Sequence, residues 1–471
     1  MQGSTGLFNR FFRDVDPQKI DPIRDRNFIL ERLLEYGDGR ALHWILNTYD
    51  INEGRRLPNL MDVKLVYSDK NGGLYTDQNL LAVGINGRQA EVADQDWIDL
   101  PTGGEVFILP GRSPLGYAKK KNELEVIDGN MAVAAILPVG YTRCLLPGYE
   151  INQHQELPLF GYTAVGAAGD KLKVAALKTD DDLKWNPVYY NTSDLPRLIA
   201  QKEKEFPRNR ILKQLAKCAI DYHCLTAQNI FYQRWEAGIP VSPVCNADCL
   251  GCISKQPAEC CPSPQGRINF IPSAAEIAEL ALPHLESGAE AIISFGQGCE
   301  GEPALQKELL VEAIKVIRQR TTKGTININS NAGYFQAVRE MADAGLDSIR
   351  VSLFSAVPEN YNWYHRPKGY TLDEVEKSLK YAADQGLMVA INLLFYPGFT
   401  NQKAETEALY GLIARTGLRQ VQLRNLNLDP EKLSTRISNE ELPTVAAWLE
   451  RLEKNFPELQ LGNYTQPIAN K

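Results

Sequence analysis

The sequence predicts an α/β protein whose largest part is a parallel sheet of six β-then-α units, closed or partly closed into a barrel. Between about residue 237 and residue 428, short apolar runs alternate with amphipathic helical runs. A helix after each strand implies parallel strands with right-handed crossovers. Before this region, shorter apolar runs separated by turn signals predict a mainly β domain, and a helical connector joins the two.

The helix boundaries support the β-then-α reading. Two helices open with capping boxes, Ser273 with Glu276 and Thr371 with Glu374. Others end at a glycine just before the next strand; these glycines are Gly288, Gly345, Gly386 and Gly417. The six expected strands are Ile239–Val244, Ala291–Phe295, Thr325–Asn329, Ser348–Phe354, Met388–Phe395 and Gln420–Leu423. Ligand groups in such folds gather at the C-terminal ends of the strands.

We expect five segments along the chain. They are a helical lead-in (1–57), a mainly β domain (58–192), a helical connector (193–236), the β/α barrel (237–428) and a C-terminal helix with a tail (429–471). In the β domain, apolar runs such as Val63–Tyr67 and Leu80–Ile85 alternate with turn signals such as Asn86-Gly87. This domain either recognises a substrate or a partner protein or caps the barrel, and its sequence leaves both alternatives open.

Composition excludes some classes of function. A hydrophobic content of 44% and a charged content of 23% are ordinary for a globular enzyme, and the net charge of −7 argues against nucleic acid as the main partner. No stretch approaches the ~20 apolar residues of a membrane helix, and Met1–Arg13 has no signal-peptide pattern. Nine cysteines, several of them clustered, indicate metal or redox chemistry in a reduced, cytoplasmic setting.

Cys245, Cys249 and Cys252 lie just after the first expected strand, at spacings of three and two intervening residues. Three thiolates can hold three corners of a cubane iron–sulfur cluster and leave the fourth iron open to chemistry. The same spacing allows a zinc knot, with a fourth ligand from Cys260, Cys261 or a histidine. The spacing favours iron–sulfur, because zinc sites prefer two CxxC pairs, and it leaves both alternatives open.

Roughly residues 238–428 resemble the radical S-adenosylmethionine (radical SAM) superfamily, whose motif is CxxxCxxC after strand one of a partial (β/α)6 barrel. The likeness is greatest to the branch with the molybdenum-cofactor cyclase and the peptide-modifying enzymes. Matching residues follow strands two to five: Gly301-Glu302-Pro303, Ser330-Asn331, Val351-Ser352-Leu353 and Asn392. The chain departs from the family pattern at three positions, where Glu300 and Ala332 replace glycines and Phe354 replaces an aspartate.

The resemblance implies two cofactors. Cys245, Cys249 and Cys252 would hold a 4Fe-4S cluster as metal ligands, and its open iron would chelate S-adenosylmethionine. The expected S-adenosylmethionine contacts are Gly301, Glu302, Ser330, Asn331, Ser352 and Asn392. One electron, from a reductant such as ferredoxin or flavodoxin, would cleave the sulfonium and give a 5′-deoxyadenosyl radical that abstracts hydrogen from a small-molecule or peptide substrate. This is oxidoreductase-type chemistry on a substrate that the sequence does not identify.

The remaining cysteines and one histidine leave alternatives. Cys260, Cys261 and Cys299 either bind an auxiliary cluster or pack around the cluster loop. Cys144, Cys218 and Cys224 are expected to be buried small hydrophobes. His365 follows strand four on an aromatic loop that either contacts substrate or packs as a lid. A second function from another class is an iron–sulfur or zinc-bearing binding module, with a degenerate barrel and a partner-binding β domain.

Overall fold

The computed structural model describes residues 62–92, 97–157, 159–180, 183–255 and 265–468. The chain divides into two compact units, Met1–Met61 and Asp62–Lys471, and the description below concerns the second. The expected helical lead-in, residues 1–57, lies outside the described residues. The expected domain boundaries stay a prediction.

The first part of the second unit is an antiparallel β region, as the sequence predicts. Its strands are β1 (Lys64–Ser68), β2 (Leu74–Asn86), β3 (Gln89–Val92), β4 (Trp97–Asp99), β5 (Glu105–Leu109), β6 (Arg112–Ala118), β7 (Glu123–Val126), β8 (Met131–Ile136), β9 (Tyr141–Arg143), β10 (Leu146–Pro147), β11 (Tyr149–Ile151), β12 (Thr163–Ala168) and β13 (Lys171–Lys178). All the pairings among them are antiparallel. At the β2–β3 hairpin, Gly87 takes φ 66, which explains the glycine in this turn.

A short 3₁₀ turn, η2 (Pro187–Tyr189), and three helices connect this region to the barrel. The helices are α4 (Leu195–Glu205), α5 (Arg210–Asp221) and α6 (Leu225–Tyr232). Helix α6 runs directly into the first parallel strand and packs against it. One face of α5 is buried, through Ile211, Leu212 and Leu215, as an amphipathic helix requires.

The second part is a parallel sheet, which confirms the predicted α/β fold with a partial barrel. Its strands follow chain order: β14 (Arg234–Gly238), β15 (Ala289–Phe295), β16 (Thr325–Ser330), β17 (Ser348–Leu353), β18 (Met388–Phe395), β19 (Gln420–Asn425) and β20 (Gln460–Gly462). Two details differ from the sequence analysis. The first strand ends at Gly238, so Ile239–Val244 is the segment that leaves the sheet rather than the strand. The tail adds β20, which pairs with β19 in parallel.

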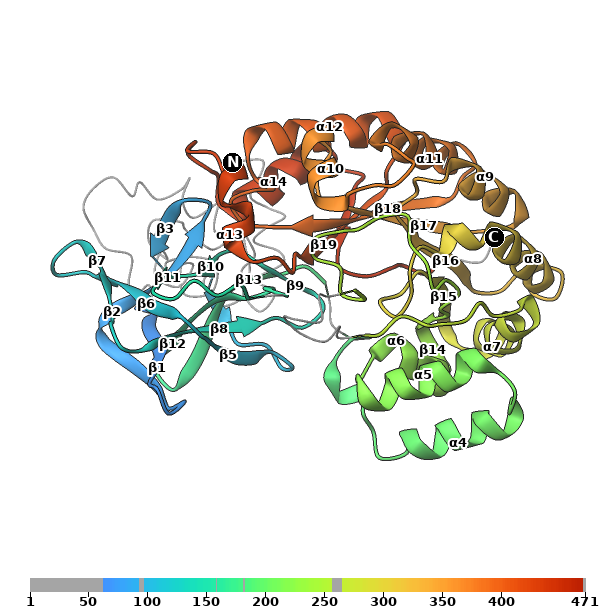
Figure 1. The fold of residues 1–471 in the computed structure, drawn as a ribbon, viewed down its shortest axis with the longest axis horizontal. Coiled ribbons are helices and arrows are strands. Elements are labelled where there is room, and N and C mark those ends of the chain that lie inside the picture. Colours follow the sequence, from blue (N-terminus) through green and yellow to red (C-terminus); the bar gives the residue numbers. More distant parts are fainter. Residues whose placement is uncertain (1–61, 93–96, 158, 181–182, 256–264, 469–471) are drawn as a thin grey trace, which may run out of the picture. The chain divides into compact units, whose positions relative to one another are not determined.

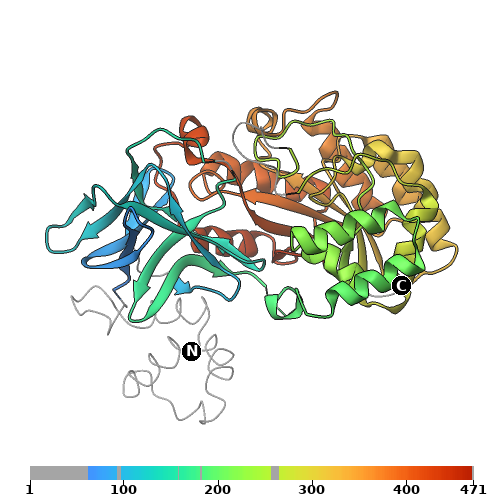
Figure 2. The same cartoon turned by 60° about the horizontal axis from the view of Figure 1, so that its bottom comes forward.

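Helices cover one side of this sheet (Figure 1). They are α7 (Ala274–Ser287), α8 (Lys307–Arg318), α9 (Phe335–Ala344), α10 (Pro358–His365), α11 (Leu372–Asp384), α12 (Lys403–Thr416) and α14 (Val445–Asn455). The short helix α13 (Pro430–Leu433) and the 3₁₀ turns η3 (Pro303–Gln306) and η4 (Ser434–Arg436) lie in connecting segments. Consecutive helices contact each other from α7 to α9 and on to α11 and α12, and the turned view shows them as one layer (Figure 2). Both predicted capping boxes are present.

Buried arginines join the β region to the segment that follows β19. Arg112 lies on β6 and pairs with Asp429 at 3.1 Å, with both side chains inaccessible to solvent. Arg143 lies on β9 and donates to the carbonyl oxygens of Phe160, Tyr162 and Leu426. These contacts hold the β region against the carboxyl end of the sheet, where ligand groups gather in such folds.

Among the helices that the structure describes, none is both long enough and apolar enough to cross a bilayer.

Candidate functional site

The cysteine loop begins where the chain leaves β14, and neighbouring elements hold its backbone. The N–H groups of Gly301 and Glu302 donate to the carbonyls of Ser242 and Val244. From the other side, the last turn of α10 accepts the N–H groups of Asp248 and Leu250 at its final two carbonyls. The loop therefore takes its shape from the ends of β15 and β17 and from α10, although residues 239–255 form no helix or strand themselves.

Cys245, Cys249 and Cys252 are all partly exposed. Burial raises the pKa of Cys249, and the charges of Cys252 and Cys245 raise it further. The pKa of Cys245 is also raised, first by burial and then by the charges of Glu302 and Cys252. The three sulfurs are thus close enough to repel one another as thiolates, and bound cationic iron would offset that repulsion.

No three His, Cys, Asp or Glu side chains in the described part of the chain converge closely enough to hold one metal ion. A cubane differs from a single ion in this respect, because each of its cysteine ligands binds a different iron atom. Cys260 and Cys261, two of the candidate fourth ligands in the zinc alternative, lie outside the described residues, so both alternatives stay predictions.

Two side chains direct N–H groups at cysteine sulfurs. His365 Nε2 accepts the N–H of Phe354 (3.1 Å), so Nδ1 carries the proton and donates to Cys249 Sγ at 3.4 Å. Burial lowers the pKa of His365 to about 3, so its ring is neutral. Arg267 Nη2 donates to Cys252 Sγ at 3.6 Å. Hydrogen bonds to cluster sulfurs are one of the means by which proteins adjust a cluster's reduction potential.

Sequence reasoning placed His365 near the site but left its role open, and it did not find Arg267. No motif contains this arginine: it lies 15 residues beyond Cys252, and only the fold brings its side chain to that sulfur.

Glu302, Ser330 and Asn331 come together beside the cysteine loop. Ser330 Oγ donates to Glu302 Oε1 (2.6 Å), and the Asn331 N–H donates to Oε2 (2.8 Å). Asn331 Nδ2 also reaches Asn246 Oδ1 on the cysteine loop (2.6 Å). Burial raises the pKa of Glu302, and its hydrogen bonds lower it. The carboxylate is 4% exposed and has no cationic partner among the described residues, so an ammonium group would complete its environment.

Gly301 must be a glycine in this geometry. A Cβ there would lie 2.0 Å from the carbonyl oxygen of Val244. The glycine lets the loop after β15 approach the cysteine loop closely enough for the two backbone hydrogen bonds described above.

The three departures from the family pattern have structural explanations. Glu300 is buried, and its carboxylate accepts the N–H groups of Val241, Ser242, Gly296 and Gln297. Ala332 takes φ 55, the left-handed conformation that glycine favours. Phe354 stacks on Tyr364 and Phe399, with ring centroids 4.6 Å and 4.5 Å apart.

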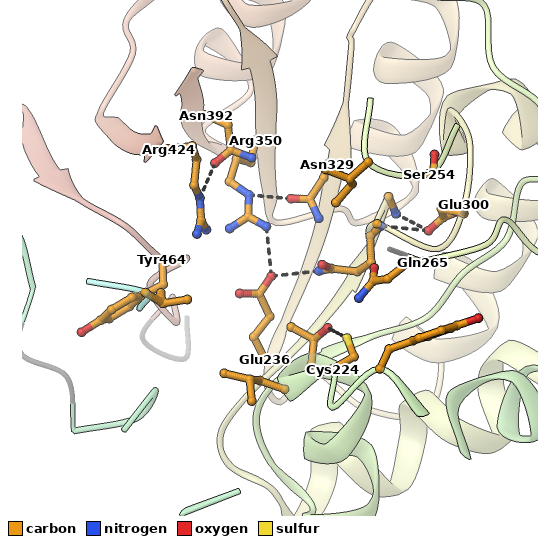
Figure 3. A pocket seen from close by; sticks show the side chains of 18 of the residues that line it. Cys224, Glu236, Ser254, Gln265, Glu300, Asn329, Arg350, Asn392, Arg424 and Tyr464 are labelled. Atoms are coloured by element: carbon orange, nitrogen blue, oxygen red, sulfur yellow. Dashed lines mark hydrogen bonds and ion pairs between the residues drawn. The ribbon is translucent and has the colours of Figure 1, made fainter. Parts of the chain in front are cut away.

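Ser352 and Asn392 lie opposite each other on β17 and β18 and line a cavity of about 610 Å³. Charged side chains from three strands also line it: Glu236 from β14, Arg350 from β17 and Arg424 from β19 (Figure 3). Sequence reasoning missed these three residues, because each lies within a strand and no motif contains them.

The remaining cysteines divide between the core and the cavity. Cys144, Cys218 and Cys299 are buried, and the thiols of Cys218 and Cys299 hydrogen-bond each other. Cys224 was expected to be buried, but this prediction is wrong. It is partly exposed and lines the cavity, because it lies at the start of α6. Cys260 and Cys261 lie outside the described residues, so an auxiliary cluster with Cys299 stays a prediction.

A family model described as the radical SAM superfamily matches residues 239–409, the stretch that contains the cysteine loop and β15 to β18. This part of the chain is a radical SAM domain. Members of this superfamily bind a 4Fe-4S cluster and S-adenosylmethionine. A second model, a family of unknown function (DUF6922), matches residues 7–56, which lie outside the described part.

The curated relatives include the mitochondrial GTP 3′,8-cyclase of Arabidopsis thaliana, 23% identical over 47% of this chain and 53% of the relative. A probable GTP 3′,8-cyclase of Methanococcus maripaludis (strain C5) is 29% identical over 35% of this chain and 51% of the relative. The chain therefore spans about half the length of the curated relatives it matches. Among solved structures, methylornithine synthase (PylB) matches with a TM-score of 0.35 and 16% identity. The match covers 58% of this chain and 75% of the methylornithine synthase chain.

Proposed function

We propose that this radical SAM protein reductively cleaves S-adenosylmethionine and abstracts a hydrogen atom from a small-molecule or peptide substrate. The observation that carries the proposal is the buried Glu302 carboxylate. It has no cationic partner in the part of the chain that the structure describes, and its charge raises the pKa of the Cys245 thiol. The amino group of S-adenosylmethionine is a cation that could pair with Glu302 while the cofactor binds a cluster held by Cys245.

Each group of residues has a physical task in the proposal. Cys245, Cys249 and Cys252 would hold the cluster, which together with bound S-adenosylmethionine would supply a 5′-deoxyadenosyl radical. Glu302 would accept the amino group, positioned by Ser330 and Asn331. Gly301 keeps Glu302 close to the cysteine loop.

Ser352 and Asn392 would face the nucleoside from paired positions on the neighbouring strands β17 and β18. The walls of the cavity would exclude water and stray hydrogen donors during the reaction. A reductant such as ferredoxin or flavodoxin would deliver the electron. The names of the curated relatives favour a nucleotide among small-molecule substrates.

Anaerobic reconstitution followed by iron and sulfide counts tests the proposal, together with an assay for 5′-deoxyadenosine under a chemical reductant. We expect about four irons per chain and formation of the nucleoside. Cys249→Ser should abolish both, whereas Cys144→Ser, in the core of the β region, should abolish neither.

Bound zinc without nucleoside would contradict the proposal and favour a metal-bearing binding module. About eight irons would instead support the auxiliary site of Cys260, Cys261 and Cys299.

A further inference from the structure

Two guanidinium groups and two carboxylates line the cavity. One carboxylate, Glu300, already accepts four backbone N–H groups, and the other three charged groups lie on strands. Glu236, Arg350 and Arg424 all line it, and they come from β14, β17 and β19. Charged side chains inside a protein need counter-charges or a full set of hydrogen bonds. The two arginines differ sharply in this respect.

Arg350 is fully engaged. It forms a buried ion pair with Glu236 at 3.3 Å and donates to Asn329 Oδ1 (2.6 Å). Its Nη1 donates to Gln422 Oε1 (3.0 Å) and to Thr465 Oγ1 (2.6 Å). Both members of the ion pair have nearly inaccessible side chains, 5% and 4% exposed. Arg350 therefore belongs to the framework of the barrel interior.

Arg424 has only long contacts with neutral groups. Its Nε donates to Asn392 Oδ1 at 3.4 Å, and its Nη2 donates to Gln422 Oε1 at 3.3 Å. No carboxylate of the described residues lies within 4.0 Å of it. Burial and the charge of Arg350 lower its pKa to about 10, while Glu236 and Asp180 act in the opposite direction from farther away, so Arg424 is charged at neutral pH.

The residues around Arg424 indicate what the rest of a bound ligand would contact. Trp185 and Tyr464 line the same cavity, with their ring centroids 6.2 Å apart. Figure 3 shows Arg424 and Tyr464 on one side of the cavity, and Ser254 of the cysteine loop and Glu300 on the other. Glu302 does not line the cavity, whereas Ser352 and Asn392, which are proposed to face the nucleoside, do line it, so the nucleoside and the substrate would share this cavity.

We propose that Arg424 binds an anionic group of the substrate, a carboxylate or a phosphate, whose apolar part lies against Trp185 and Tyr464. A guanidinium presents two parallel N–H groups that match both anions, and its unused donors face a cavity large enough for a small ligand. The anion is held on the side away from the cysteine loop, which leaves the remainder of the substrate directed toward the loop. This inference rests on the proposed function and adds the substrate class to it.

The test uses ¹⁹F NMR on anaerobically reconstituted protein with S-adenosylmethionine bound. The probes are 4-fluorobenzoate, its neutral isostere 4-fluorobenzamide, and 4-fluorophenyl phosphate. We expect the anions to bind about tenfold more tightly than the amide. The anion that binds more tightly shows whether the substrate's anionic group is a carboxylate or a phosphate. Arg424→Gln should remove the preference. Arg419→Gln, which deletes an exposed arginine just before the same strand, should retain it.

Arg424→Lys keeps the charge without the fork and should show an intermediate preference, which covers the case in which Arg424→Gln folds poorly. Equal binding of benzoate and benzamide to the wild type, or no binding of any probe, would overturn the inference. Loss of S-adenosylmethionine binding in Arg424→Gln would also overturn it, by assigning the arginine to the cofactor. The 5′-deoxyadenosine assay on the same samples reports on the proposed function separately, because uncoupled cleavage needs no substrate.

Discussion

The hydrogen bond from His365 to Cys249 leads to a prediction about the cluster's reduction potential. His365 makes one bond with each ring nitrogen: Nε2 accepts from Phe354, and Nδ1 donates to Cys249 Sγ. Substitution of His365 by glutamine or by asparagine tests these two hydrogen bonds one at a time. Glutamine places its amide near Nε2 and can keep the bond to Phe354, whereas asparagine places its amide near Nδ1 and can keep the donor to the sulfur.

The expected magnitude follows from the strength of the bond. A hydrogen bond to a charged group contributes about 1.5–3 kcal/mol. Reduction adds electron density to the sulfurs, so the bond is stronger in the reduced state. If about half of its strength distinguishes the two states, its loss lowers the midpoint potential by roughly 30–65 mV, because about 59 mV and about 1.36 kcal/mol both correspond to a factor of ten for one electron.

The assay is a redox titration of the reconstituted cluster followed by electron paramagnetic resonance. We expect His365→Gln to have the lower potential at near-normal stability. His365→Asn should keep the wild-type potential but lose about 1–3 kcal/mol of unfolding free energy, because the buried N–H of Phe354 loses its acceptor. Potentials that agree in wild type and both variants would refute the argument.

Three further predictions concern the framework of the site. Arg112→Met should lower the free energy of unfolding by about 3–5 kcal/mol, because it leaves Asp429 buried without its partner, and chemical denaturation should show recovery in the double variant with Asp429→Leu. Gly301→Ala should reduce the iron content after reconstitution, because the new Cβ would lie 2.0 Å from the Val244 carbonyl oxygen; a normal iron count would contradict this. The hydrogen bond from Arg210 is the main cause that lowers the pKa of Glu276 to about 2, below its ordinary 4.5. The contribution of Glu276 to stability is therefore present above about pH 4.5 and is lost as the pH falls toward 2. Unfolding titrations should show a weaker pH dependence in that window for Glu276→Gln, and an unchanged slope would contradict the assignment.

Apolar runs predicted β15 to β19 because these strands are buried on both faces and therefore consist largely of hydrophobic residues. The first strand was placed too late for the same reason. Ile239–Val244 is the more apolar run, whereas the true strand, Arg234–Gly238, includes Trp235 and the cavity-lining Glu236. A strand that contributes charge to a functional cavity violates the pattern by which buried strands are recognised.

The polar interior of the barrel could not be read from the sequence. Glu236 and Arg350 are separated by 114 residues, and Gln422, which accepts from two arginines, lies still farther along the chain. Only the register of parallel strands brings them together. The motif residues were easier to find, because Glu302 and Ser330 follow strand ends, and strand ends in a parallel sheet meet at one edge.

The hydrogen-bonding requirements of the cysteine loop explain why this chain has Glu300 at a position where the family pattern has a glycine. The loop forms no regular structure, so its backbone N–H groups need acceptors from outside it. Glu300 provides two of them: Oε2 accepts from Val241 and Ser242, while Oε1 accepts from the turn after β15. A glycine would leave four N–H groups to find other partners, and a glutamine would direct its NH₂ group at two of them. The carboxylate therefore joins the start of the cysteine loop to the segment after β15 that contains Glu302, and so helps to set the distance between the proposed cluster ligands and the proposed amino-group acceptor.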